Sequence, residues 1–171
     1  MSGFSVRLRG LWRDTEGNTL IGFALLLPAL LGFSFAILEF SLVAFDFHRA
    51  NEATRRIARA ATMVPPLVNQ NTLINAQTAQ CTGSSCTGLA ALTAEAQQIY
   101  PDITVDNVQI TYTMTTVGDL ATPGGIKPLI TVRLTGLTHE FLLMRAFPGV
   151  PANMTLPPFL TTMLGVWYPP V

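Results

Sequence analysis

The stretch Leu20–Leu38, LIGFALLLPALLGFSFAIL, holds 19 residues without a charged side chain. A helix rises about 1.5 Å per residue, so this stretch reaches nearly 30 Å, the thickness of the hydrocarbon core of a bilayer. No water inside a bilayer can satisfy backbone N–H and C=O groups, so a run of this kind is helical there. We therefore predict a transmembrane helix over these residues.

Two other interpretations of the run remain open. A buried core helix of a soluble protein would have to be wrapped by the remaining chain, of which only about 130 residues follow. A cleaved secretory signal peptide usually has an apolar region of roughly 7–15 residues that ends in an A-x-A-like cleavage site. This run is longer, and no such site ends it. A lasting membrane anchor fits the sequence better than either alternative.

Several positions within the run and at its end have a predicted role. Pro28 removes one helix hydrogen bond and is expected to kink the helix, which membrane helices tolerate. Small residues such as Gly22 allow neighbouring helices to approach closely. We take Gly22, Phe23 and Pro28 as the candidate helix-packing positions. Glu39 follows the run directly, so we expect it at the bilayer boundary, without a buried partner.

The charges that flank the run do not settle its orientation. Three arginines precede it and four follow it before residue 60: Arg7, Arg9, Arg13, Arg49, Arg55, Arg56 and Arg59. The positive-inside rule is therefore ambiguous, but long domains translocate largely regardless of their charge. A pair of cysteines in the C-terminal part also favours export to an oxidising compartment. We predict a cytoplasmic N-terminus and an exported C-terminal domain.

The helix is expected to continue beyond the run over residues 40–62. One face of this segment is apolar at helical spacing, with Ala53, Ile57, Ala60 or Ala61, and Val64. Another face carries Arg49, Glu52, Arg56 and Arg59, and Glu52 precedes Arg56 by the four residues that favour an ion pair. These arginines either contact lipid phosphates or a partner, or form a solvated face. Pro65-Pro66 is expected to end the helix.

Cys81 and Cys86 are the first and last residues of the short sequence CTGSSC. In an oxidising compartment they would close a small ring, with Gly83 easing the turn and a loop-closure stabilisation of roughly 2 kcal/mol. The alternatives are free thiols or half of a metal site. A tetrahedral zinc needs four ligands, and the only histidines, His48 and His139, are distant in sequence. We predict a disulfide.

The C-terminal part alternates polar, helical and strand-like segments. Residues 67–87 are predicted as a polar loop or short helix that holds the cysteine ring, and GLAALTAEAQQIYP as a short amphipathic helix ended by Pro101. Strand periodicity appears over residues 103–114, with a break at Asp106-Asn107, and again over 129–137. Residues 139–151 are mixed and apolar. A last strand is expected within 154–167, weakened by Pro157-Pro158. VGDLATPGGIKP is predicted to be a turn or loop.

These elements predict an α+β fold, in which a long N-terminal transmembrane helix extends into a small exported domain. That domain contains a short helix and an antiparallel β-sheet packed on the long helix. The predicted boundaries are a charged leader at residues 1–17, the transmembrane and amphipathic helix at 18–62, and the α+β domain at 63–171.

The sequence contains no motif of a catalytic or cofactor-binding kind. The formal net charge is zero and only 12% of residues are charged, so no basic face for nucleic acid is expected. No phosphate-binding loop, dinucleotide fingerprint, zinc-protease or nucleophile-elbow motif occurs. His139-Glu140 is the one polar pair of catalytic type, and neighbouring strand residues point to opposite faces. We therefore expect no enzyme activity, no cofactor and no metal site.

Two segments together resemble the TadE-like family, the pilin-like minor subunits of tight-adherence (Flp-type) pili. They are EGNTLIGFALLLPALLGFSFAILEF and RANEATRRIARAA. In that family a charged leader ends in glycine, an apolar run with an early proline follows, and an alanine-rich helix with arginines comes next. The family also has a Glu-Phe pair soon after the glycine and a Glu-Phe-Gly-like stretch at the end of the run. Gly17 matches the glycine, Phe23 the phenylalanine of the early pair and Pro28 the proline. Glu39 and Phe40 match the stretch at the end of the run.

The resemblance implies that a prepilin peptidase of the membrane cuts the chain between Gly17 and Asn18 on the cytoplasmic side. It also implies a minor pilin or pseudopilin that takes part in assembly or priming of a pilus. Its partners would be other pilin and minor pilin subunits, the inner-membrane assembly platform and membrane lipid. The alternative is a single-pass anchored periplasmic binding or scaffold protein that does not polymerise. A third interpretation, an anchored enzyme, has no motif in its favour.

One position departs from the family pattern. The fifth residue after the implied cleavage is usually glutamate, and here it is Gly22. In related fibres that carboxylate neutralises the terminal amine of a neighbouring subunit inside the apolar core. Gly22 has no carboxylate, so the resemblance implies a subunit that accepts a neighbour's terminus poorly.

Overall fold

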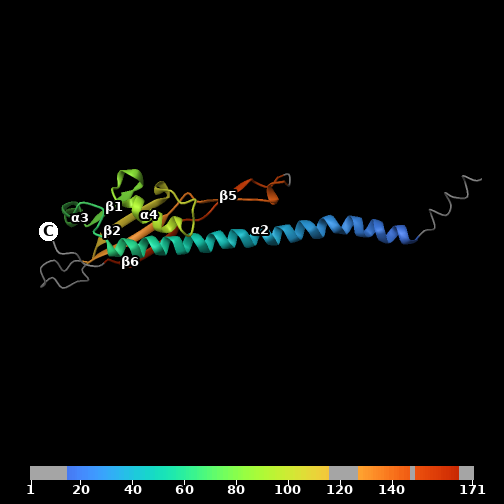
Figure 1. Ribbon diagram of the computed structural model, residues 1–171, viewed down its shortest axis with the longest axis horizontal. Coiled ribbons are helices and arrows are strands. Elements are labelled where there is room, and N and C mark those ends of the chain that lie inside the picture. The colour runs from blue at the N-terminus through green and yellow to red at the C-terminus, as the bar shows by residue number, and fades with distance from the viewer. Residues whose placement is uncertain (1–14, 116–126, 147–148, 166–171) are drawn as a thin grey trace, which may run out of the picture.

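The computed structural model describes residues 15–115, 127–146 and 149–165, and it has the predicted α+β architecture. One long helix, α2 (Thr15–Met63), forms the axis of the molecule, and a small head lies against its C-terminal part (Figure 1). The predicted leader before Thr15 and most of the predicted loop VGDLATPGGIKP lie outside the described residues.

The limits and the packing of α2 follow from its sequence. Pro28 lies inside the helix, and the helix ends at Met63, just before Pro65-Pro66, as predicted. The C-terminal half buries a stripe of small and β-branched side chains. These residues are fully buried: Ala50, Ala53, Ile57, Ala58 and Ala61. Four alanines in this stripe let the elements of the head approach the helix axis closely.

The head is built on a four-stranded antiparallel sheet with the order β1-β2-β3-β6. The strands are β1 (Thr78–Thr82), β2 (Val108–Met114), β3 (Pro128–Leu134) and β6 (Phe159–Leu164). Alternate residues of β2 and β3 are buried, and Ile110 pairs with Val132 in the register. This alternation turns one face of the sheet to α2, which contacts β3 and β6.

The short helix α4 (Leu89–Gln97) packs on α2 and completes the core. Its buried residues include Leu89, Leu92 and Ala96, which follow the spacing of one face of the predicted amphipathic helix. The remaining elements of the head are α3 (Gln70–Ala76), η1 (Gly83–Ser85) and η2 (Val105–Asn107).

A second, two-stranded sheet leaves the head and runs beside α2 (Figure 1). It consists of β4 (Thr138–Glu140) and β5 (Asn153–Thr155), and η3 (Met144–Ala146) lies between them. His139 pairs with Met154 in the register. We call residues 138–155 the hairpin. The sequence pattern treats residues 139–151 only as mixed and apolar, and does not predict this element.

Three details differ from the sequence-based expectation. The polar segment 67–87 contains an edge strand, β1. Its side chains are mostly exposed, and it forms a strand because pairing with β2 satisfies its backbone N–H and C=O groups. Residues 103–107 are not strand and contain η2, since Asn107 Oδ1 accepts hydrogen bonds from the amide and hydroxyl of Thr104. Pro157-Pro158 separates two strands, β5 and β6, where one weakened strand was expected, because proline cannot donate to a ladder.

Candidate functional site

The N-terminal half of α2 presents an exposed apolar surface. Leu20 is 72% exposed and Leu25 is 75% exposed, and the most apolar part of the helix has no buried residue. A core helix of a soluble protein would be mostly buried, so this interpretation of the run is wrong. Among the described residues, α2 is the one helix long and apolar enough to cross a membrane. The run therefore indicates a membrane anchor.

The candidate processing and packing positions all lie on this exposed half. Gly17 and Asn18 lie within the first turns of α2, which begins at Thr15. A side chain at Gly22 would meet nothing within 4 Å, and Phe23 is 65% exposed. Pro28 continues the same helix. This surface is open to neighbouring helices or to lipid along its length.

Glu39 attaches the hairpin to α2. Its side chain is only 1% exposed, and Oε1 accepts hydrogen bonds from the backbone N–H groups of Leu143 and Met144. The expectation that Glu39 has no buried partner is therefore wrong. The physical reason is that the hairpin returns along the helix, covers this carboxylate and supplies two donors to it.

His139 extends this attachment from β4 to the next turn of the helix. Its Nδ1 lies 2.6 Å from Asp46 Oδ2, and its Nε2 lies 4.0 Å from Glu39 Oε2. Oε2 of Glu39 and Nε2 of His139 are buried and form no hydrogen bond. A doubly protonated imidazole would therefore face a carboxylate at each nitrogen. Glu39, Asp46 and His139, which we call the polar cluster, join two segments 93 residues apart.

Arg49 of α2 contacts the head of its own chain. Its Nε donates to the carbonyl of Ile99 at 2.7 Å, and its Nη1 lies 3.8 Å from Asp46 Oδ1. The guanidinium also lies over the rings of Phe45 and Tyr100, at 5.3 and 5.2 Å from their centroids. Burial raises the pKa of Tyr100. Arg49 therefore has contacts with the head that neither interpretation of the charged face includes.

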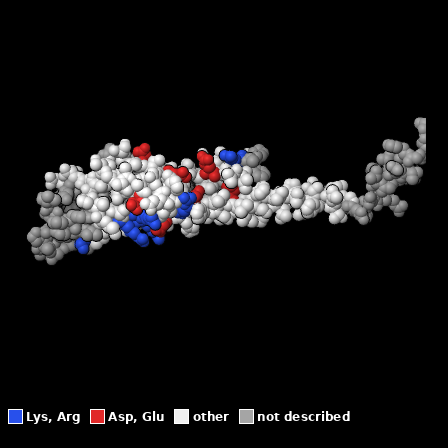
Figure 2. Space-filling view, in the orientation of Figure 1, with Lys and Arg blue, Asp and Glu red and all other residues white. Residues whose placement is uncertain are grey.

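The other arginines of α2 form an exposed basic surface (Figure 2). Arg56 donates to Oε1 of Gln98 on the head, and the structure has no ion pair between it and Glu52, although both side chains are described. Arg55 and Arg59 are exposed. These three side chains are therefore open to solvent, and both interpretations of the charged face stay predictions for them.

A cavity of about 380 Å³ opens beside the polar cluster. Its lining residues are Asp46, Tyr100, Asp102, Thr138, His139 and Glu140. Three carboxylates line it, so an anionic ligand would be repelled. His139 is buried and Glu140 is exposed, which confirms that the two point to opposite faces of β4.

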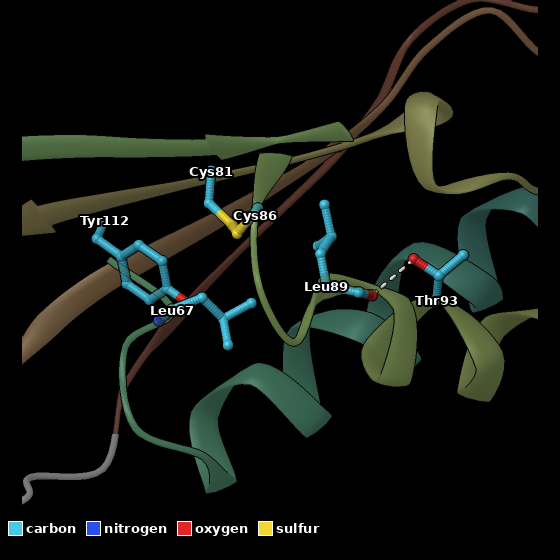
Figure 3. The surroundings of a disulfide bond; sticks show 6 residues. All are labelled: Leu67, Cys81, Cys86, Leu89, Thr93 and Tyr112. Carbon is cyan, nitrogen blue, oxygen red and sulfur yellow. Dashed lines mark hydrogen bonds between the residues drawn. A yellow bond between two sulfur atoms is a disulfide. The ribbon is translucent and has the colours of Figure 1, made fainter. Parts of the chain in front are cut away.

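Cys81 and Cys86 are joined in a disulfide, as their spacing predicts. Cys81 lies on β1, and Gly83 turns the chain with a φ of +63°, which suits glycine. Figure 3 shows the bond between the side chains of Tyr112 and Leu89. Tyr112 is fully buried, and its hydroxyl accepts a hydrogen bond from the backbone of Leu67. The disulfide therefore fixes the start of α4 against the sheet.

Comparison with known proteins agrees with the N-terminal resemblance. A family model described as TadE-like protein matches residues 17–59, from Gly17 to Arg59, which lies about one turn before the end of α2. No curated protein and no solved structure matches the chain. The match covers the exposed apolar run and most of the helix face that carries the head, and it includes none of the strands. Residues 17–59 are therefore a TadE-like segment, which is consistent with a TadE-like protein of tight-adherence pili.

Proposed function

We propose that the protein is a minor pilin or pseudopilin that takes part in assembling or priming a tight-adherence pilus. The observation that carries this proposal is the TadE-like match, which begins at Gly17 and follows an exposed apolar helix into the core of a small head. Such a helix anchors the subunit in the inner membrane and can then pack beside the helices of other subunits. The role is structural, without catalysis or a cofactor.

The proposed orientation places the N-terminus in the cytoplasm and the head in the periplasm. The disulfide between Cys81 and Cys86 supports it, since such bonds persist in oxidising compartments. The proposed partners are other pilin and minor pilin subunits, the prepilin peptidase, the assembly platform and membrane lipid.

The first prediction concerns processing. We expect the mature chain to begin at Asn18, because the family match begins at Gly17 and the polar leader meets the apolar run there. Mass spectrometry of the protein extracted from membranes that contain the peptidase should show the loss of residues 1–17. Recovery of Met1, Ser2 or Gly3 as the main terminus would contradict the pilin role and favour an anchored protein that does not polymerise.

The second prediction concerns copy number. We expect few copies per pilus, because Gly22 has no carboxylate for a neighbour's terminal amine, and a buried unpaired ammonium costs several kcal/mol. The carboxylate of Glu39 does not replace the one that is missing at Gly22. This carboxylate lies about 25 Å further along the helix, is buried, and already accepts two backbone hydrogen bonds. Quantitative mass spectrometry of sheared filaments measures the copy number, and abundance close to that of the major pilin would contradict the prediction.

A gain-of-function variant sharpens this test. Gly22→Glu introduces the missing carboxylate at a position where a side chain meets nothing within 4 Å, so it should raise the subunit's share of the filament. Ile21→Glu is the matched control, because it adds the same charge one residue away, on another face of the helix. An equal rise for both variants would show that the position of the carboxylate is irrelevant.

A further inference from the structure

We propose that the tip of the hairpin, residues 141–145, rests in the interfacial layer of the bilayer that α2 crosses, with its apolar side chains toward the hydrocarbon and Arg145 at the lipid phosphates. This inference rests on the membrane anchoring in the proposed function. It adds a second contact between the head and the membrane, made by a segment more than 100 residues away from the anchor in sequence.

The position of the tip relative to the membrane follows from Glu39. Leu38 is the last residue of the apolar run, and the next residue, Glu39, holds the backbone of Leu143 and Met144. The tip is therefore fixed at the level where the hydrocarbon core ends. Figure 1 shows the hairpin extending along α2 away from the main sheet, toward the N-terminal half of the helix.

The side of the helix that faces the tip is consistent with this placement. Almost every residue of the run is exposed, and the half-buried ones near its end are Gly32, Phe35 and Ala36. These three share one helix face with Glu39, because they precede it by seven, four and three residues. The tip therefore lies on a face of α2 that continues into the run.

The chemistry of the tip suits the boundary between lipid and water. The sequence FLLMR, residues 141–145, is apolar except for its last residue. Leu142 is 63% exposed, and Met154 on the adjacent strand is 38% exposed. Exposed apolar area is stabilised by transfer out of water, at about 25 cal/mol per Å².

Arg145 supplies the charge that such a contact requires. It is exposed, it is the one arginine or lysine in the sequence of the hairpin, and Figure 2 shows a basic group at the free end of the hairpin. A long arginine side chain can bury its stem and keep its guanidinium among phosphates. The apolar residues thus match the hydrocarbon, and the arginine matches the layer of lipid phosphates beside it.

The test measures the depth of a fluorophore on the tip of the full chain. The native cysteines form a disulfide, so the single thiol of Leu142→Cys can be labelled with an environment-sensitive dye. The protein is reconstituted in vesicles of phosphatidylcholine and phosphatidylglycerol that carry nitroxide lipids in both leaflets. The nitroxide is placed either near the ester carbonyl or near the end of the acyl chain. Because both leaflets carry it, the orientation of the protein does not affect the result.

We expect blue-shifted emission at Leu142→Cys and quenching several-fold stronger than at Leu160→Cys, a matched control on β6 that is 59% exposed. The nitroxide near the ester carbonyl should quench more strongly than the one at the chain end. Adding Arg145→Gln should reduce the quenching in vesicles that contain phosphatidylglycerol.

A third label, at Phe33→Cys in the run, distinguishes a failure of the interfacial tip from a failure of the membrane anchor. Strong quenching at Phe33 with none above the Leu160 control at Leu142 would overturn the interfacial tip and leave the anchor intact. Absence of quenching at both sites would overturn the anchor and the tip together. Blue-shifted but unquenched emission at Leu142 would place the tip against protein, which also overturns the proposal.

Discussion

Replacing Ile57 by alanine is expected to lower the free energy of unfolding of the head by about 2–5 kcal/mol. The side chain is fully buried in the stripe of α2 that faces the sheet and α4, so its truncation leaves a cavity. Small domains are stable by only about 5–15 kcal/mol, so the loss is a large part of the total. Denaturant unfolding of the full chain in detergent micelles measures it.

The matched control for this variant is Arg55→Ala. Arg55 lies two residues away on the same helix and is exposed, so its replacement should change the stability by about 0.5 kcal/mol or less. Equal stability of the Ile57→Ala variant and the native chain would show that the head does not depend on α2 for its core.

Replacing Glu39 by alanine is expected to release the hairpin from the helix. Without Oε1, the amides of Leu143 and Met144 lose their acceptor, and His139 loses one of the two carboxylates that it faces. Hydrogen bonds to charged groups are among the stronger ones, so these amides should exchange with deuterium on the order of tenfold to a hundredfold faster. Hydrogen–deuterium exchange of the protein in micelles, resolved over residues 138–155, measures the effect.

Ser41→Ala is the control for this experiment. Ser41 is close to Glu39 in sequence and is exposed, and its hydroxyl donates to the carbonyl of Ile37 in its own helix. Its replacement should leave exchange in the hairpin unchanged. If the Glu39→Ala variant exchanged like the native chain, the hairpin would be held by other contacts, and the polar cluster would not be its attachment.

The elements with regular patterns were predictable because periodicity reports which face is buried. The long helix, its end before Pro65-Pro66, α4 and the central strands β2 and β3 all have apolar residues at the spacing of their structure. Edge strand β1 was missed because an edge strand with mostly exposed side chains has no apolar alternation, and only its pairing with β2 identifies it.

The polar cluster was not predictable for a different reason. Glu39, Asp46 and His139 meet only because the hairpin turns back along the helix, and nothing local specifies that return. One signal was present in the sequence. Glu39 is a single charge with apolar residues on both sides, in AILEFSLVAF, and a charge in such a setting needs a partner.

The continuity of α2 has a mechanical consequence. The helix has neither glycine nor proline between Gly32 and its end at Met63, so it lacks the residues at which helices usually kink. It passes from the apolar run into the core of the head without a flexible joint. A force that pulls on the head therefore acts directly along the anchor, and a rotation of the anchor about its axis turns the head by the same angle. A subunit built this way transmits force and torque between the head and the anchor, whereas a flexible linker between the two would transmit neither.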